Sequence, residues 1–166
     1  MEGQPGRKTR IRKENALILR GSVIVLALAG LANALYFTFA YYGRVRQSRW
    51  VPQVFCAREG SSCVTVVRTP YGSVFGVPNS LLGILYYGLL ILWAVGGQSA
   101  RLTVQVNMTA YILTFTDLLI AAGSVTVALG FYLIFALRRI LHTDCRLCYA
   151  AHAINLLVLV LLVAAR

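Results

Sequence analysis

The sequence predicts an all-α integral membrane protein, a four-transmembrane-helix bundle with a long outer loop after the first helix. Hydrophobic residues make up 58% of the 166 residues, and no charged residue occurs within residues 21–43 or 69–100. A helix needs about 20 apolar residues to cross the hydrocarbon core of a bilayer. Because lipid offers the backbone no hydrogen-bonding partners, such runs must be helical.

The ends of the apolar runs place the four membrane spans. We expect them at about residues 21–42, 80–97, 112–137 and 145–165. A basic cytoplasmic leader, residues 1–20, precedes the first span, and residues 43–79 form the outer loop that follows it. Residues 21–166 are therefore expected to form a single membrane domain.

The first span has an alternative interpretation as a cleaved signal peptide. Ala32-Asn33-Ala34 has the small-x-small form of a cleavage site. The apolar run continues beyond that site to Tyr42, however, and its last residues are rich in aromatic side chains. Such residues are typical of the belt at a membrane interface, so a retained helix is the better interpretation.

One carboxylate interrupts the third apolar region, which runs from Leu102 to Leu137. This region is too long for one straight span and too short for two. Counting back about 20 residues from Leu137 reaches Leu118, so Asp117 is expected near the inner interface, where a carboxylate is tolerated. A deeper position would make Asp117 a candidate functional residue.

The net charge of +11 predicts contact with anionic lipid headgroups, because the cationic side chains gather at the ends of the apolar runs. Nucleic acid is not an expected partner, since no folded soluble surface is left to present a basic patch. The 16 Lys and Arg residues divide equally between the two sides of the membrane. The cluster before the first span usually decides orientation. Both termini are then cytoplasmic, and all four cysteines lie on the outer side of the membrane.

The second cysteine pair, Cys145 and Cys148, forms a C-x-x-C sequence where the last helix should begin. The free backbone N–H groups and the macrodipole at a helix start stabilise a thiolate, the reactive form of cysteine. Asp144 is the expected N-cap residue. A disulfide that closes so short a loop adds little stability, so redox chemistry is the better explanation for this pair.

The first pair, Cys56 and Cys63, lies in the polar outer loop with six residues between the two thiols. A pair in such a loop can move between an outside partner and a buried cysteine pair. One alternative is a structural disulfide. A zinc site built from all four cysteines is another, although zinc knuckles usually have two to four intervening residues; we expect no metal.

Two further polar residues share a face of the last helix with the C-x-x-C pair. Cys145, Cys148, His152 and Asn155 follow the spacing i, i+3, i+7 and i+10, which is one helical stripe. A His and an Asn in a membrane helix need partners and could serve only to pack helices together. Their alignment below the C-x-x-C pair favours a polar pocket that accepts protons and binds a ligand oxygen.

The order of the motifs resembles the vitamin K epoxide reductase family in its prokaryotic form. A spaced cysteine pair follows the first span, and a C-x-x-C pair opens the last. Between and after them come Thr69-Pro70-Tyr71-Gly72, Phe75-Gly76-Val77-Pro78-Asn79-Ser80-Leu81-Leu82-Gly83 and Ala153-Ile154-Asn155. The resemblance covers nearly all of the chain from the first span onward.

The resemblance implies a helix bundle around a quinone, which would be ubiquinone, menaquinone or phylloquinone. It further implies that electrons pass from a separate thioredoxin-like, DsbA-like partner to the quinone. Cys56 would exchange with the partner, Cys63 would pass electrons to Cys145, and Cys148 would face the quinone ring.

The same resemblance implies roles for pocket residues. Asn79 matches the position that hydrogen-bonds a quinone carbonyl, and Thr69 keeps the hydroxyl that many members have as Ser. His152 stands where animal members have Tyr, so a hydrogen-bonding role is expected. Tyr86 or Tyr87, two helical turns beyond Asn79, is expected to form an aromatic wall of the site.

Two other functions are weighed against this one. A DsbB-type quinone reductase also has two cysteine pairs in a membrane bundle, but there the C-x-x-C pair comes first and the spaced pair second, the reverse of the order here. A non-enzymatic membrane scaffold would hold two structural disulfides that never exchange. The motif order favours the vitamin K epoxide reductase-like enzyme.

Overall fold

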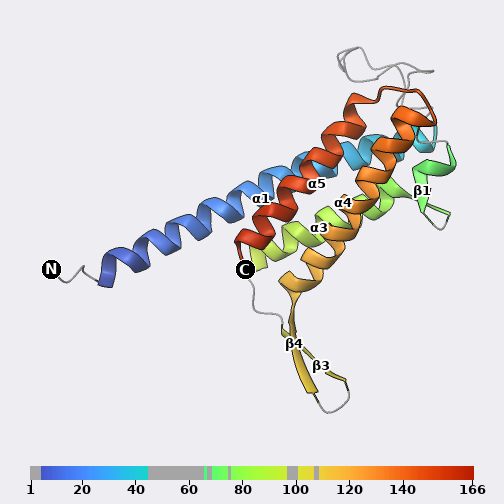
Figure 1. Cartoon of the computed structure of the whole chain (residues 1–166). Coiled ribbons are helices and arrows are strands. Elements are labelled where there is room, and N and C mark those ends of the chain that lie inside the picture. The colour runs from blue at the N-terminus through green and yellow to red at the C-terminus, as the bar shows by residue number, and fades with distance from the viewer. Residues whose placement is uncertain (1–4, 45–65, 67–68, 75, 97–100, 107–108) are drawn as a thin grey trace.

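The computed structural model describes residues 5–44, 66, 69–74, 76–96, 101–106 and 109–166. Long helices dominate this part of the chain and pack side by side (Figure 1). They are α1 (Pro5–Tyr41), α3 (Asn79–Gly96), α4 (Phe115–Arg139) and α5 (Arg146–Ala164). Four helices in the described residues are long and apolar enough to cross a membrane. The predicted fold class, a four-helix membrane bundle, is therefore confirmed.

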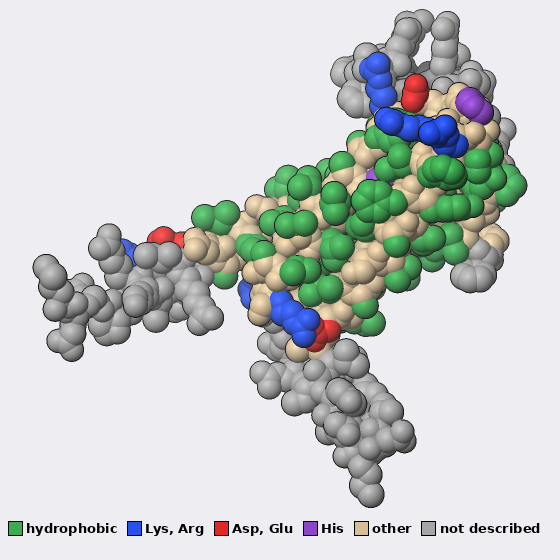
Figure 2. Space-filling model, viewed as in Figure 1, with side chains coloured by type: hydrophobic (Ala, Val, Ile, Leu, Met, Phe, Trp, Pro, Cys, Tyr) green, Lys and Arg blue, Asp and Glu red, His purple; other side chains and the backbone are tan. Residues whose placement is uncertain are grey.

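Buried apolar side chains between the helices hold the bundle together. Helix α1 packs against α3 and α5, and α4 packs against α5 and α3. The fully buried side chains of this apolar core include Val23, Leu90, Val158 and Leu162. Large hydrophobic side chains remain exposed on the outward faces, and Figure 2 shows them covering the visible side of the bundle between charged residues at its ends. Such an exterior suits a protein whose solvent is lipid.

Helix α1 is longer than the first predicted span. It begins at Pro5, so most of the basic leader is helical and extends beyond the bundle in Figure 1. Lys, Arg, Glu, Ala and Leu in this segment are good helix formers, and proline is favoured at the first position of a helix. The part of α1 that could cross the membrane is Glu14–Tyr41.

A β-hairpin that the sequence did not predict precedes α4. Strands β3 (Arg101–Val106) and β4 (Thr109–Thr114) pair antiparallel and project from one end of the bundle (Figure 1). Their β-branched residues suit a strand. Because the region is also apolar, the sequence instead predicts a third span that starts at residue 112, within β4. Helix α4 instead begins at Phe115. The long third apolar region is thus a hairpin followed by a single helix.

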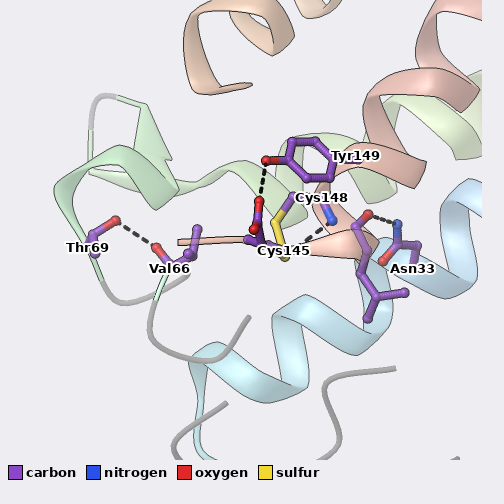
Figure 3. Close-up of a disulfide and its surroundings, with 8 residues drawn as sticks. Asn33, Val66, Thr69, Cys145, Cys148 and Tyr149 are labelled. Carbon is purple, nitrogen blue, oxygen red and sulfur yellow. Dashed lines mark hydrogen bonds between the residues drawn. A yellow bond between two sulfur atoms is a disulfide. The ribbon is translucent and has the colours of Figure 1, made fainter. Parts of the chain in front are cut away.

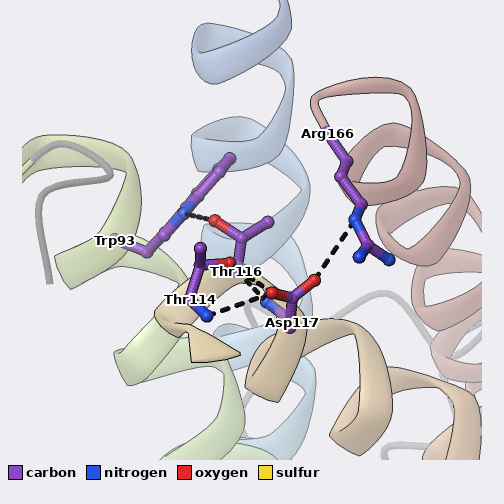
Figure 4. Close-up of polar contacts among 5 residues, drawn as sticks. All are labelled: Trp93, Thr114, Thr116, Asp117 and Arg166. Atoms are coloured by element: carbon purple, nitrogen blue, oxygen red, sulfur yellow. Dashed lines mark hydrogen bonds and ion pairs between the residues drawn. The ribbon is translucent and has the colours of Figure 1, made fainter. Parts of the chain in front are cut away.

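Asp117 lies in the first turn of α4, where it completes a capping box (Figure 4). Its Oδ2 accepts hydrogen bonds from the Thr114 backbone N at 3.0 Å and from Thr114 Oγ1 at 2.7 Å. The Asp117 backbone N donates back to Thr114 Oγ1 at 3.2 Å, and Arg166 Nε lies 3.3 Å from Asp117 Oδ1. The carboxylate therefore sits at a helix end with structural partners, as a position near the interface requires.

Removing this cap tests its contribution to stability. We expect Thr114→Ala to lower the free energy of unfolding by about 1 kcal/mol, the usual cost of losing an N-cap hydroxyl. Thermal or denaturant unfolding of the detergent-solubilised protein measures the change. Ser124→Ala is the control, because its exposed hydroxyl bonds only to the Ile120 carbonyl of its own helix. Equal stability of the two variants would contradict this role for the cap.

The opposite end of the bundle carries a compact turn that leads into α3. A 3-10 helix, η2 (Pro70–Gly72), is followed by the short antiparallel strands β1 (Ser73–Val74) and β2 (Val77–Pro78). Gly76, between the strands, has a φ of +80°, a conformation that favours glycine. We call this the outer end, following the predicted orientation, and the end with the β3–β4 hairpin the inner end.

Candidate functional site

The C-x-x-C pair is joined by a disulfide at the start of α5 (Figure 3). The Cα atoms of Cys145 and Cys148 are 5.3 Å apart. Cys145 is the N-cap residue, and its sulfur accepts a hydrogen bond from the Cys148 backbone N at 3.3 Å. The sulfur thus takes the place of a capping oxygen, and a thiolate formed there would be stabilised by that N–H group.

The expectation that Asp144 caps this helix is wrong. Asp144 lies one residue too early, because the helix begins at Arg146. Its Oδ1 instead accepts a hydrogen bond from the Tyr149 hydroxyl at 3.2 Å. The Arg138 guanidinium lies 5.4 Å from the centre of the Tyr149 ring, and its Nε is 3.4 Å from the Tyr149 hydroxyl. These contacts tie the end of α4 to the start of α5 and so hold the disulfide in place.

The two sulfurs of the disulfide have different surroundings. Cys145 is fully buried in an apolar cluster with Phe37 and Leu137. Cys148 is only partly buried and lines a cavity inside the bundle. Of the two, Cys148 is therefore the cysteine placed to meet a ligand.

The cavity has a volume of about 570 Å³, within the range of small-molecule sites in proteins. Its walls come from all four long helices and from the η2–β1 turn at the outer end. Mostly apolar side chains line it, with a few polar groups among them. The polar side chains that the argument uses are Asn33, Asn79, Tyr87, Cys148, His152 and Asn155.

Three residues of the predicted stripe, Cys148, His152 and Asn155, line the cavity. Cys145, the fourth, is the N-cap residue and lies in the apolar cluster instead. His152 packs against Gly130 of α4, where a Cβ atom would lie only 2.7 Å from the His152 Nδ1. That Nδ1 is buried and has no hydrogen-bond partner among the described residues. The imidazole therefore lies between α4 and the cavity, and it packs against Gly130 because that residue has no side chain.

Asn79 is the first residue of α3 and also lines the cavity. Its Nδ2 donates a hydrogen bond to the Tyr71 carbonyl at 3.1 Å, which ties the helix to the η2 turn. The amide carries two N–H groups, so one remains for a ligand oxygen. Asn79 thus lines the same cavity as Cys148 and His152. Its hydrogen bond to a quinone carbonyl stays a prediction.

Of the two predicted aromatic wall residues, Tyr87 lines the cavity and Tyr86 is not among its described lining residues. Successive residues of a helix point about 100° apart, and here it is Tyr87 that is turned toward the cavity. The Tyr86 hydroxyl instead packs against Gly123 of α4 and has no hydrogen-bond partner among the described residues. The sequence left both tyrosines open, and helix rotation selects Tyr87.

Thr69 is also absent from the described residues that line the cavity. Its Oγ1 donates to the Val66 carbonyl at 2.7 Å (Figure 3). The Thr69 carbonyl accepts from the Gly72 backbone N at 2.9 Å. The hydroxyl therefore stabilises the turn beside the cavity. Its contact with a ligand stays a prediction.

Asn33 of α1 is a cavity residue that the sequence reasoning missed. Its Nδ2 donates to the Leu147 carbonyl at 3.1 Å, which joins α1 to the segment between the two cysteines (Figure 3). Its Oδ1 is buried without a partner among the described residues. An amide inside a membrane span needs a polar partner, and this is the signal in the sequence that could have identified Asn33.

Cys56 and Cys63 lie outside the described residues. Their disulfide chemistry and the transfer of electrons from Cys63 to Cys145 therefore stay predictions.

A membrane bundle with a C-x-x-C disulfide beside an internal cavity is the arrangement expected of a membrane oxidoreductase. The sequence model described as the Vitamin K epoxide reductase family matches residues 22–163, most of the chain. The chain therefore belongs to the vitamin K epoxide reductase family, and it is a membrane oxidoreductase. No individual curated protein matches the sequence.

Proposed function

We propose that the protein oxidises a thioredoxin-like partner and passes the electrons to a quinone, and so supports disulfide bond formation. Cys56 exchanges with the partner, Cys63 reduces the Cys145–Cys148 disulfide, and Cys148 faces the quinone. The observation that carries the proposal is that Cys148 lines the same cavity as Asn79 and His152. A reactive cysteine and two hydrogen-bonding side chains thus converge on one mostly apolar site.

The cavity residues fit a quinone. The apolar walls suit its ring and tail, and Asn79 and His152 supply polar groups for ring oxygens at the level of the disulfide. Tyr87 adds an aromatic wall. When bound, a quinone supplies an acceptor for two electrons and two protons. Ubiquinone, menaquinone and phylloquinone share this chemistry, so the proposal covers all three.

The chain's own residues divide the thiol chemistry between them. Once the disulfide is reduced, the Cys148 backbone N–H and the start of α5 favour the thiolate of Cys145. Re-forming the disulfide joins the two sulfurs and releases two electrons and two protons, which a bound quinone would accept. The Cys145 thiolate is the group placed to attack the Cys148 sulfur in that step. Helix α5 keeps the two sulfurs one turn apart throughout, so the step needs no large movement.

The proposed location is a bacterial cytoplasmic membrane with the cysteines on the outer side. The argument is that the basic residues of α1 precede the first membrane span, where they usually decide orientation. The arginines at the two ends of the bundle would then contact lipid headgroups. Accessibility of Arg10→Cys to a membrane-impermeant thiol reagent, in cells and after lysis, tests this orientation.

Turnover of the purified protein tests the enzymatic proposal. We expect the detergent-solubilised protein to oxidise a reduced thioredoxin-like protein when menadione is present and to stop after a single exchange without it. Free thiols of the partner, counted over time, give the rate. Absence of quinone-dependent turnover would contradict the proposal and would favour a scaffold with disulfides that do not exchange.

A further inference from the structure

The inner part of the cavity carries a hydrogen-bonded pair of polar side chains, away from the disulfide. The Tyr87 hydroxyl donates a hydrogen bond to Asn155 Oδ1 at 2.7 Å, and both side chains line the cavity. Tyr87 is only 4% exposed and Asn155 only 7%. Asn155 follows Cys148 by seven residues, about 10 Å along the helix axis. The pair therefore lies deeper than the groups considered so far.

Gly30 of α1 is what allows Tyr87 to reach this position. A Cβ atom at Gly30 would overlap the Tyr87 ring, so any other residue type would require the ring to move. Helices α1 and α3 approach each other closely here because of that glycine. Gly30 thus forms a notch that holds the phenol ring against Asn155.

The hydrogen bond from Tyr87 also decides how the Asn155 amide is turned. Because Oδ1 accepts the phenol proton, the Nδ2 group is the donor that remains. This Nδ2 makes no hydrogen bond with the residues that the structure describes. Asn155 is 7% exposed and lines the cavity, so a ligand oxygen there could accept a hydrogen bond from this N–H group.

We propose that Asn155 is a specificity-determining residue whose Nδ2 donates to a ring carbonyl oxygen at the inner end of the cavity. Tyr87 is its positioning residue, and Gly30 is the notch that seats Tyr87. This inference rests on the proposed function and deepens it. Asn79 begins α3 and Tyr87 lies eight residues later, about 12 Å along that helix. Asn79 and the Tyr87–Asn155 pair therefore lie at different depths of the cavity.

Equilibrium binding of menadione to the oxidised protein tests the inference without electron transfer, because the disulfide is closed. We expect Tyr87→Phe to raise the Kd about tenfold, the usual effect of losing the orientation of one hydrogen bond. Asn155→Leu should weaken binding by at least as much. Tyr86→Phe is the matched control and should leave the Kd unchanged, because Tyr86 does not belong to the described cavity lining.

The double variant separates positioning from independent contact. If Tyr87 acts through Asn155, adding Tyr87→Phe to Asn155→Leu should weaken binding no further. Two additive losses would show that Tyr87 acts by itself and would overturn its role as a positioning residue. Wild-type affinity in Tyr87→Phe would overturn the inference as a whole.

Gly30→Ala reaches the same pair without removing any polar group. The added methyl should displace the Tyr87 ring and weaken menadione binding as Tyr87→Phe does. Gly88→Ala is the control, since a Cβ there has no neighbour within 4 Å. Equal affinity in the two glycine variants would contradict the role of the notch.

These binding measurements distinguish the inference from the proposed function. Tight binding of menadione that Tyr87→Phe weakens, with no turnover by the wild type, would support the site and refute the enzyme. Turnover by the wild type, with the same menadione affinity in the wild type and in Tyr87→Phe, would support the enzyme and refute the site. A wild-type protein that does not bind menadione at all would overturn the inference.

Discussion

Cys148→Ala is expected to abolish quinone reduction while leaving Cys56 and Cys63 able to exchange with the partner. Cys148 is the cysteine of the C-x-x-C pair that lines the cavity, whereas Cys145 is fully buried in an apolar cluster. Without the Cys148 thiol, the described residues that line the cavity include no sulfur, and the disulfide cannot re-form. Turnover should fall by at least about a thousandfold, the scale on which removal of a covalent nucleophile acts in enzymes.

Two measurements make this prediction specific. Menadione reduction, followed by its absorbance, reports the step at Cys148. Mixed-disulfide formation with a reduced thioredoxin-like protein reports the step at the outer pair. The expected result is loss of the first with retention of the second. Retained menadione reduction in Cys148→Ala would refute the assigned order of the cysteines.

Gly130→Val is expected to impair quinone turnover through His152, with no change to any cysteine. A Cβ at position 130 would lie 2.7 Å from His152 Nδ1 and 3.2 Å from its Cγ, so the imidazole must move. Because α4 lies on one side of the ring and the cavity on the other, the ring should move into the cavity. The KM for menadione should then rise by roughly 10- to 100-fold, from a lost hydrogen bond together with overpacking.

Gly88→Val is the matched control, because a Cβ at Gly88 meets nothing within 4 Å. Both variants add the same side chain to a membrane helix, so general effects on insertion should be equal. The Cys145–Cys148 disulfide should form in both, as measured by thiol counting. A wild-type KM in Gly130→Val would show that His152 does not contribute to the site.

Local periodicity explains how much of the site could be predicted. Cys148, His152 and Asn155 share a face of α5 because the helical repeat of 3.6 residues dictates it, whatever packs against that face. The start of α5 was misjudged by one residue, since Asp144 and Cys145 can both cap a helix and only the folded chain shows which one does. The hairpin before α4 was missed because apolar β-branched residues suit both a strand and a membrane helix.

By itself, the sequence determined the membrane class, the number of spanning helices, the C-x-x-C pair at a helix start and the polar stripe below it. These features depend on neighbours along one chain segment, where hydropathy and helical spacing are sufficient. Only the tertiary structure decided that Tyr87 rather than Tyr86 meets the cavity, that Asn33 joins it, and that Gly30 and Gly130 seat the rings of Tyr87 and His152. Such choices depend on how helices distant in sequence rotate and approach, which close packing between their side chains determines.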